Sequence, residues 1–310
     1  MRWLFFSASL FWAASAMAQA PVDSSQLMKD ISTLSADKFE GRKVGTRGSR
    51  MAQFYIIDRF RKIGLAGYHD TYEYPFYFQQ GEKRIMGTNL FGYIPGKLNQ
   101  AIVVSAHYDH LGIGKPNEAK DSIYNGADDD ASGVAALLTM AKYFKQHPPR
   151  YTIIFAALDG EEEGLQGAKA FVAQPPVPLE TIRQNINMDM VSHNDKNELY
   201  VCGTSQFPDL KPYIDKVAAN SAVRLIAGHD KPEQGHDDWT QQSDQYEFFQ
   251  KKIPFLYFGV EDHPDYHQLT DEYTRINPSF YYRAVKTILQ VIEEMDRNLP
   301  VDKFSGAKTM

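Results

Sequence analysis

The sequence predicts a single α/β domain with a mostly parallel, twisted central sheet sandwiched between helices. Three observations carry this prediction. About 290 residues remain after an N-terminal leader, enough for one large domain. Five short runs are almost continuously apolar, which is typical of strands buried on both faces of a parallel sheet. Helical patterns alternate with these runs, as in the α/β class.

The leader comes first along the chain. Residues 1–18 begin with Arg2, continue with an apolar stretch and end in Ala16-Met17-Ala18, an A-x-A cleavage signal. We therefore expect a signal peptide cleaved after Ala18, and an exported protein that is periplasmic or secreted. The alternative is an uncleaved anchor. The apolar stretch is shorter than the roughly 20 residues of a membrane span, and no later segment reaches that length.

Residues 19–310 then form the predicted catalytic domain. Apolar residues recur at helical spacing in 25–36, 49–63, 132–144 and 278–295. The expected strands are 101–107, 151–158, 185–191, 198–203 and 254–260. The segment 64–86 is aromatic and irregular, so we expect a hairpin or a small cap around 64–90 on the same domain. No Pro/Gly/Ser-rich linker divides the chain.

Composition excludes several classes. The formal charge is −6 and the pI about 5.9, which gives no basic face for nucleic acid. Cys202 is the only cysteine, so the chain makes no internal disulfide. We expect a monomer without a membrane span.

Acidic and histidine side chains gather where the predicted strands end. An aspartate triplet, Asp128–Asp130, also precedes the helix at 132–144. The carboxyl ends of parallel strands form the edge at which open α/β sheets bind ligands, so these groups predict a site there. The clusters are His107, Asp109 and His110; Asp159 and Glu161–Glu163; Asp189; and Glu261, Asp262, His263, Asp265 and His267.

Imidazole and carboxylate together suit zinc, with manganese or cobalt as possible substitutes. The candidate ligands are too many for one tetrahedral ion and about right for two ions that share a bridging carboxylate. A calcium loop is the other interpretation of the triplet. It is disfavoured because "DDDASG" lacks the alternating spacing and distal glutamate of an EF-hand.

The runs "SAHYDHLG", "NGADDDASG", "ALDGEEEGLQG", "NMDM" and "DYHQLTD" occur in the order and spacing of a known family. They resemble the co-catalytic dizinc aminopeptidases of the secreted bacterial leucyl aminopeptidase type, from about residue 34 to residue 277. The resemblance implies a zinc exopeptidase fold with two Zn²⁺ per chain. It also implies an exported metallo-aminopeptidase that hydrolyses the N-terminal bond of peptides with a free N-terminus.

The resemblance also implies roles for single residues. The metal ligands are His107 and Asp189 for one ion, Glu162 and His267 for the other, and Asp129 as the bridge. Glu161 is the general base that activates a metal-bridging water. Asp109 accepts the second ring N–H of His107, and Tyr266 steadies the tetrahedral intermediate. The peptide bond between Asp129 and Asp130 is expected to be cis.

One stretch departs from the family pattern. Many relatives have Arg-Ser-Asp where this chain has Gln242, Ser243 and Asp244, so contacts made by that arginine are not carried over. Two other functions remain as alternatives: a glutaminyl cyclase-type acyltransferase with a single zinc, and a non-catalytic binding module on the same scaffold. The native metal and the preferred N-terminal residue stay open.

Overall fold

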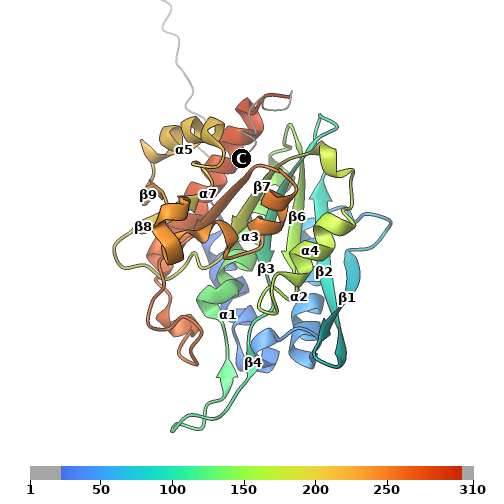
Figure 1. Ribbon diagram of the computed structural model, residues 1–310, viewed down its shortest axis with the longest axis vertical. Helices are drawn as coiled ribbons and strands as arrows, with labels where there is room; N and C mark the ends of the chain where they lie inside the picture. The colour runs from blue at the N-terminus through green and yellow to red at the C-terminus, as the bar shows by residue number, and fades with distance from the viewer. Residues whose placement is uncertain (1–21, 302–310) are drawn as a thin grey trace, which may run out of the picture.

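The computed structural model describes residues 22–301 and is shown in Figure 1. Within that range the chain forms an eight-stranded sheet in the order β1-β2-β6-β3-β7-β10-β8-β9 and a ribbon, β4-β5. The strands are β1 (Glu73–Gln80), β2 (Lys83–Ile94), β3 (Ala101–His107), β4 (Gly112–Ile113), β5 (Ile123–Tyr124), β6 (Thr152–Leu158), β7 (Ile182–Met188), β8 (Glu198–Cys202), β9 (Arg224–Ala227) and β10 (Phe255–Gly259). The helices are α1 (Ser24–Leu34), α2 (Arg47–Ile63), α3 (Gly133–Gln146), α4 (Gln166–Ala173), α5 (Lys211–Ala218), α6 (Gln245–Gln250) and α7 (Pro278–Asn298).

The centre of the sheet is parallel. Strands β6, β3, β7 and β10 run in one direction, whereas β1–β2, β2–β6 and β10–β8 are antiparallel pairs. The register pairs His107 with Leu158 and Phe258 with Met188. The four central strands therefore end at one edge, and the predicted fold class is confirmed.

Alternate side chains of β3 pack into two different hydrophobic clusters on the two faces of the sheet. Ile102 and Val104 join the larger cluster, which also contains residues of α1, α2, α3 and α7. Val103 joins a smaller cluster with Phe171 of α4 and Phe248 of α6. Figure 1 shows α4 across the front of the sheet and α1 behind it. Burial on both faces explains why the sequence of β3 is apolar throughout.

The four predicted helices are confirmed as α1, α2, α3 and α7, with ends that local chemistry explains. Asn277 accepts the N–H of Phe280 and Pro278 occupies the first turn of α7, as is usual at a helix start. Helix α2 ends at Gly64, whose φ of 81° lies in the left-handed region that favours glycine.

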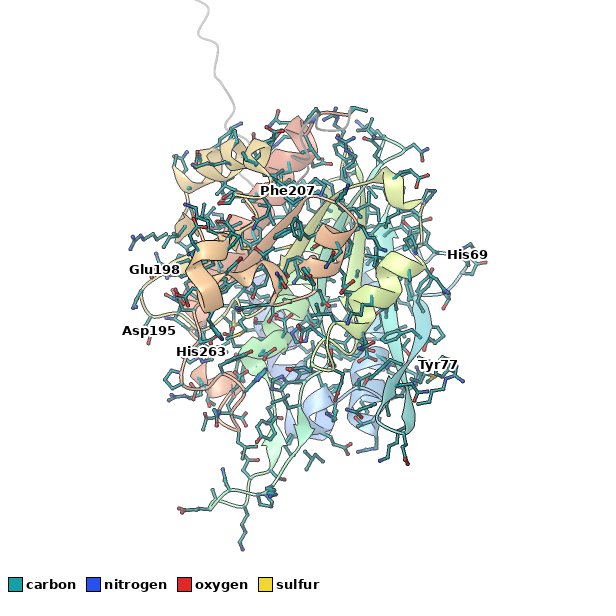
Figure 2. The ribbon with its side chains drawn as sticks, viewed as in Figure 1. His69, Tyr77, Asp195, Glu198, Phe207 and His263 are labelled. Carbon is teal, nitrogen blue, oxygen red and sulfur yellow. The ribbon has the colours of Figure 1, made fainter. Side chains whose placement is uncertain are left out.

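The aromatic segment forms the β1–β2 hairpin, and β2 continues along β6 as part of the central sheet. Tyr74 packs on Phe91 with ring centroids 4.5 Å apart, while Tyr77 stays 56% exposed at the sheet edge (Figure 2). The predicted leader, residues 1–18, lies outside the described residues. Between residues 22 and 301, none of the helices is long and apolar enough to cross a bilayer.

Cys202 ends β8 in a small buried cluster of its own. It packs with Trp239, Phe255 and Tyr257. Its side chain has no exposed surface, and burial raises the pKa of the thiol well above its usual value.

Candidate metal centre

The carboxyl edge of the central strands opens onto a cleft of about 620 Å³. Because β3, β6, β7 and β10 end together here, side chains that are distant in sequence meet at the cleft. The predicted residues that line it are His107, Asp129, Glu161, Glu162, Asp189, Tyr266 and His267. The structure thus brings every predicted site residue to the cleft except Asp109, whose carboxylate accepts the N–H groups of Glu161 and Glu162.

The aspartate triplet occupies a tight turn (Ala127–Ser132) before α3, and its three carboxylates point in different directions. Asp128 accepts hydrogen bonds from the N–H and hydroxyl of Ser192, at 2.6 and 2.7 Å. Asp130 accepts the N–H of Gly133 at the start of α3, at 2.8 Å. Asp129 is left to face the cleft. The Asp129–Asp130 peptide bond is cis, which confirms the expectation.

Asp129 presents its two oxygens to two different histidines. Its Oδ1 lies 3.2 Å from Nε2 of His107, and its Oδ2 lies 3.1 Å from Nε2 of His267. The carboxylate is nearly buried, so the two oxygens are held in these positions. A carboxylate that faces two histidines from opposite oxygens can bridge two ions.

On the His107 side, a second carboxylate is available. Asp189 Oδ1 lies 3.5 Å from His107 Nε2 and is buried without a hydrogen-bond partner among residues 22–301. His107, Asp130 and Asp189 each offer a potential ligand atom within 4.8 Å of the others. Asp130 is the least free of the three, because its oxygens already accept the N–H groups of His107, Gly133 and Met190. A buried, unpaired carboxylate beside an imidazole is the donor set that a zinc-like ion would complete.

On the Glu162 side, the structure adds a residue that the sequence prediction lacked. His267 Nε2 lies 3.3 Å from Glu162 Oε2, as expected. The fully buried His110 also places Nδ1 2.8 Å from Glu162 Oε1, and His110, Asp129 and Glu162 form a second potential ligand group. The signal was the run "HYDH" at the end of β3, whose second histidine was not assigned a role.

Asp109 makes a different contact from the one expected. The Nδ1–H of His107 is oriented by the main-chain carbonyl of Asp109 at 3.2 Å, whereas the carboxylate Oδ1 lies 3.7 Å away. The carboxylate instead accepts the N–H groups of Glu161 and Glu162, at 3.1 and 3.4 Å. Asp109 therefore couples the end of β3 to the loop after β6, because one residue orients His107 and holds both glutamates.

The surroundings of Glu161 raise the pKa of its carboxyl. Burial, opposed by His107 and reinforced by Asp189 and Asp244, raises the pKa of Glu161 well above its usual value. Asp244 is itself buried, and the loss of hydration raises its pKa to about 8. A carboxyl with a raised pKa can both accept and return a proton near neutral pH.

Two side chains hold the triplet loop from outside the cleft. The fully buried Arg42 donates to the carbonyls of Leu34, Tyr108, Asn125 and Gly126, at 2.6–2.9 Å. Asp271 accepts the N–H groups of the first two triplet residues at 2.9 and 3.1 Å, and burial raises its pKa to about 7. The sequence did not predict a role for Arg42 or Asp271, because neither residue matches the spacing of the metal-ligand motifs.

Tyr266, the remaining predicted residue, and Gln242 both line the cleft. The ring of Tyr266 stacks on His267 with centroids 4.0 Å apart. Gln242, where relatives have arginine, also lines the cleft and donates from Nε2 to the carbonyl of His236 at 2.6 Å.

Known proteins are similar to this chain in sequence and in fold. The chain is 26% identical over 277 residues to a probable zinc metalloprotease of Pyrenophora teres f. teres (strain 0-1), which covers 71% of this chain and 59% of the relative. The structure matches a leucine aminopeptidase precursor from Bacteroides thetaiotaomicron VPI-5482 with TM-score 0.70, 18% identity, 89% of this chain and 98% of that one. It matches Porphyromonas gingivalis glutaminyl cyclase with TM-score 0.71, 17% identity, 88% of this chain and 99% of that one. At such identities the two structures confirm the zinc exopeptidase fold and no more.

The sequence family is established by a match to a family model. The chain spans between 49% and 59% of the length of three curated relatives that it matches. The model of peptidase family M28, by contrast, matches residues 89–292, which is more than half of this chain and includes the loops that carry the cleft residues. The chain therefore belongs to peptidase family M28.

Proposed function

We propose that this protein is a dizinc aminopeptidase that removes the first residue of peptides. The observation that supports the proposal most strongly is the two-sided Asp129 carboxylate, whose opposite oxygens face His107 and His267 at 3.2 and 3.1 Å. A site for a single ion would need only one of these sets. In this proposal His107 and Asp189 would hold one zinc, Glu162 and His267 would hold the other, and Asp129 would contribute to both.

Bound zinc ions would supply a Lewis acid for the scissile carbonyl and would acidify water near neutral pH. Glu161 is the proposed general base, which takes a proton from the attacking water and returns it to the leaving amine. Asp109 is a positioning residue that fixes the main chain of Glu161. The Tyr266 hydroxyl is proposed to donate to the oxygen that becomes negative in the transition state.

Charge in the cleft supports recognition of a free α-amino group. Two more acidic residues, Glu247 and Asp262, line the cleft besides the proposed ligands and base. The lining contains one lysine, Lys169. The proposed zinc ions would offset the charge of their ligands, which leaves Glu247 and Asp262 to favour an ammonium group over the uncharged middle of a peptide chain.

Chromogenic amides of leucine, alanine and glutamine test the proposal, each with a free and with an acetylated amino group. We expect hydrolysis of the free amides alone, with zinc required. Equal hydrolysis of acetylated amides would contradict an aminopeptidase. Cyclisation of N-terminal glutamine without hydrolysis would instead identify the acyltransferase alternative.

We also propose that the protein is exported, to the periplasm or beyond the cell, because of the leader at residues 1–18. N-terminal sequencing of the protein from culture fractions tests this. The mature chain should begin at Gln19, and an intact Met1 in the cell pellet would contradict it.

A further inference from the structure

A third group of potential metal-ligand side chains lies outside the cleft. His193, in the loop after β7, and His263 and Asp265, in the loop after β10, each offer a potential ligand atom within 4.8 Å of the others. The three residues are absent from the lining of the cleft. Figure 2 labels His263 on the left-hand side of the molecule, on the same side as Asp195. The group therefore needs an explanation separate from the peptidase site.

One nitrogen of His263 is fixed and the other is free. Its Nε2 lies 3.0 Å from Asp128 Oδ2, and since a carboxylate accepts, Nε2 donates the hydrogen bond and Nδ1 is left as the potential ligand atom. Only 8% of the His263 side chain is exposed, and its Nδ1 is buried without a hydrogen-bond partner among residues 22–301. A carboxylate that fixes the tautomer of an imidazole is the usual support of a metal-binding histidine.

His193 lies against His263. Its Nδ1 is also buried and unpartnered among the described residues, and its ring centroid lies 3.8 Å from that of His263. His193 Nδ1 stands 3.7 Å from Asp265 Oδ2, too far for a hydrogen bond. Two ligands bound to one tetrahedral zinc at its normal bond lengths stand roughly 3.3 Å apart, so the observed separation is close to that of a ligand pair.

A neighbouring arginine holds the carboxylate of the group in place. Arg275 donates from Nε to Oδ2 at 3.1 Å, and its side chain is 58% exposed.

We propose that His193, His263 and Asp265 bind a third divalent ion of the zinc class, apart from the cleft. Two imidazoles and one carboxylate leave coordination positions open for water, and the His193 side chain is 16% exposed, which gives an entry path. The ion would tie the loop after β7 to the loop after β10. Through His263 it would also support Asp128, the neighbour of Asp129. The site does not depend on the proposed function.

Ion counting tests the third site. The full mature chain is loaded with excess zinc and desalted, and the zinc per chain is measured by native mass spectrometry and by elemental analysis. We expect His193→Ala and His193→Asn each to carry one ion fewer than the wild type. The matched control is His69→Ala, which removes an exposed histidine at the opposite edge of the molecule (Figure 2) and should carry the wild-type number.

The two proposals fail separately. If both His193 variants fold, bind as many ions as the wild type and hold them with the same affinity in a competition with a chelator, the third site is refuted. Glu162→Gln reports on the cleft instead, and an unchanged ion count in that variant would contradict the dizinc proposal while leaving the third site untouched.

Discussion

Replacing Arg42 by methionine should destabilise the whole domain. The guanidinium makes four hydrogen bonds of 2.6–2.9 Å to main-chain carbonyls, and its side chain is about 1% exposed. Methionine fills part of the volume but donates nothing, so all four bonds are lost, and among the four carbonyls that of Gly126 still accepts the N–H of Ala131. Hydrogen bonds that involve a charged group contribute about 1.5–3 kcal/mol each, a gross loss of roughly 6–12 kcal/mol.

The gross loss is offset because the variant no longer buries a charge, which costs several kcal/mol. We therefore expect the free energy of unfolding to fall by about 3–5 kcal/mol, which is the gross loss less the several kcal/mol that burying the charge costs. Urea unfolding, followed by circular dichroism with and without zinc, measures it. Arg47→Met is the control, since that side chain is 71% exposed and pairs only with Glu40 at the surface, and we expect a change within about 0.5 kcal/mol. A fall of less than about 1 kcal/mol for Arg42→Met would refute the reasoning.

Three further predictions concern the metal centre. Glu161→Gln should lower kcat at least about 100-fold with unchanged metal content. Glu162→Gln should lower metal content, and Glu163→Gln, whose side chain pairs with Lys43, should do neither; metal loss in Glu161→Gln alone would show the two roles reversed. Chelation should abolish peptidase activity and zinc or cobalt should restore it, with at least two zinc ions per active chain; full activity with a single bound ion would contradict the dizinc site. In the metal-free protein, hydrogen bonds to Asp129 and Glu162 outweigh burial and raise the pKa of His267 to about 10, so the ring is protonated at neutral pH and zinc must displace that proton. Calorimetry in buffers of different ionisation enthalpy should show proton release at about pH 7.5, and its absence would contradict this.

The central strands were predictable because burial on both faces leaves a strong signal. The run 101–107 matches β3 at both ends. Strand β2 is harder to predict from the sequence. It begins as an exposed arm of the hairpin at Lys83 and becomes buried only from Gly87 onwards. Its sequence therefore changes character along one strand, and the pattern did not predict that it continues to Ile94 beside β6.

The cleft residues were predictable because metal ligands must be histidines or carboxylates near strand ends, and few residue types qualify. Arg42 and Asp271 bind main-chain atoms, which every residue possesses, so their partners leave no mark in the sequence. His110 was visible in the sequence, but spacing alone does not say which histidine of "HYDH" faces Glu162.

Cys202 gives the molecule an internal reporter of opening. The chain has no other cysteine, and this thiol is fully buried against Trp239 and Tyr257, two aromatic residues that also line the cleft. A thiol-specific reagent can reach it only when β8 and β10 separate or the cleft wall lifts away, so the labelling rate measures the free energy of that local opening. If substrate analogues slow the labelling while the global unfolding rate stays constant, the cleft wall moves as a unit during binding.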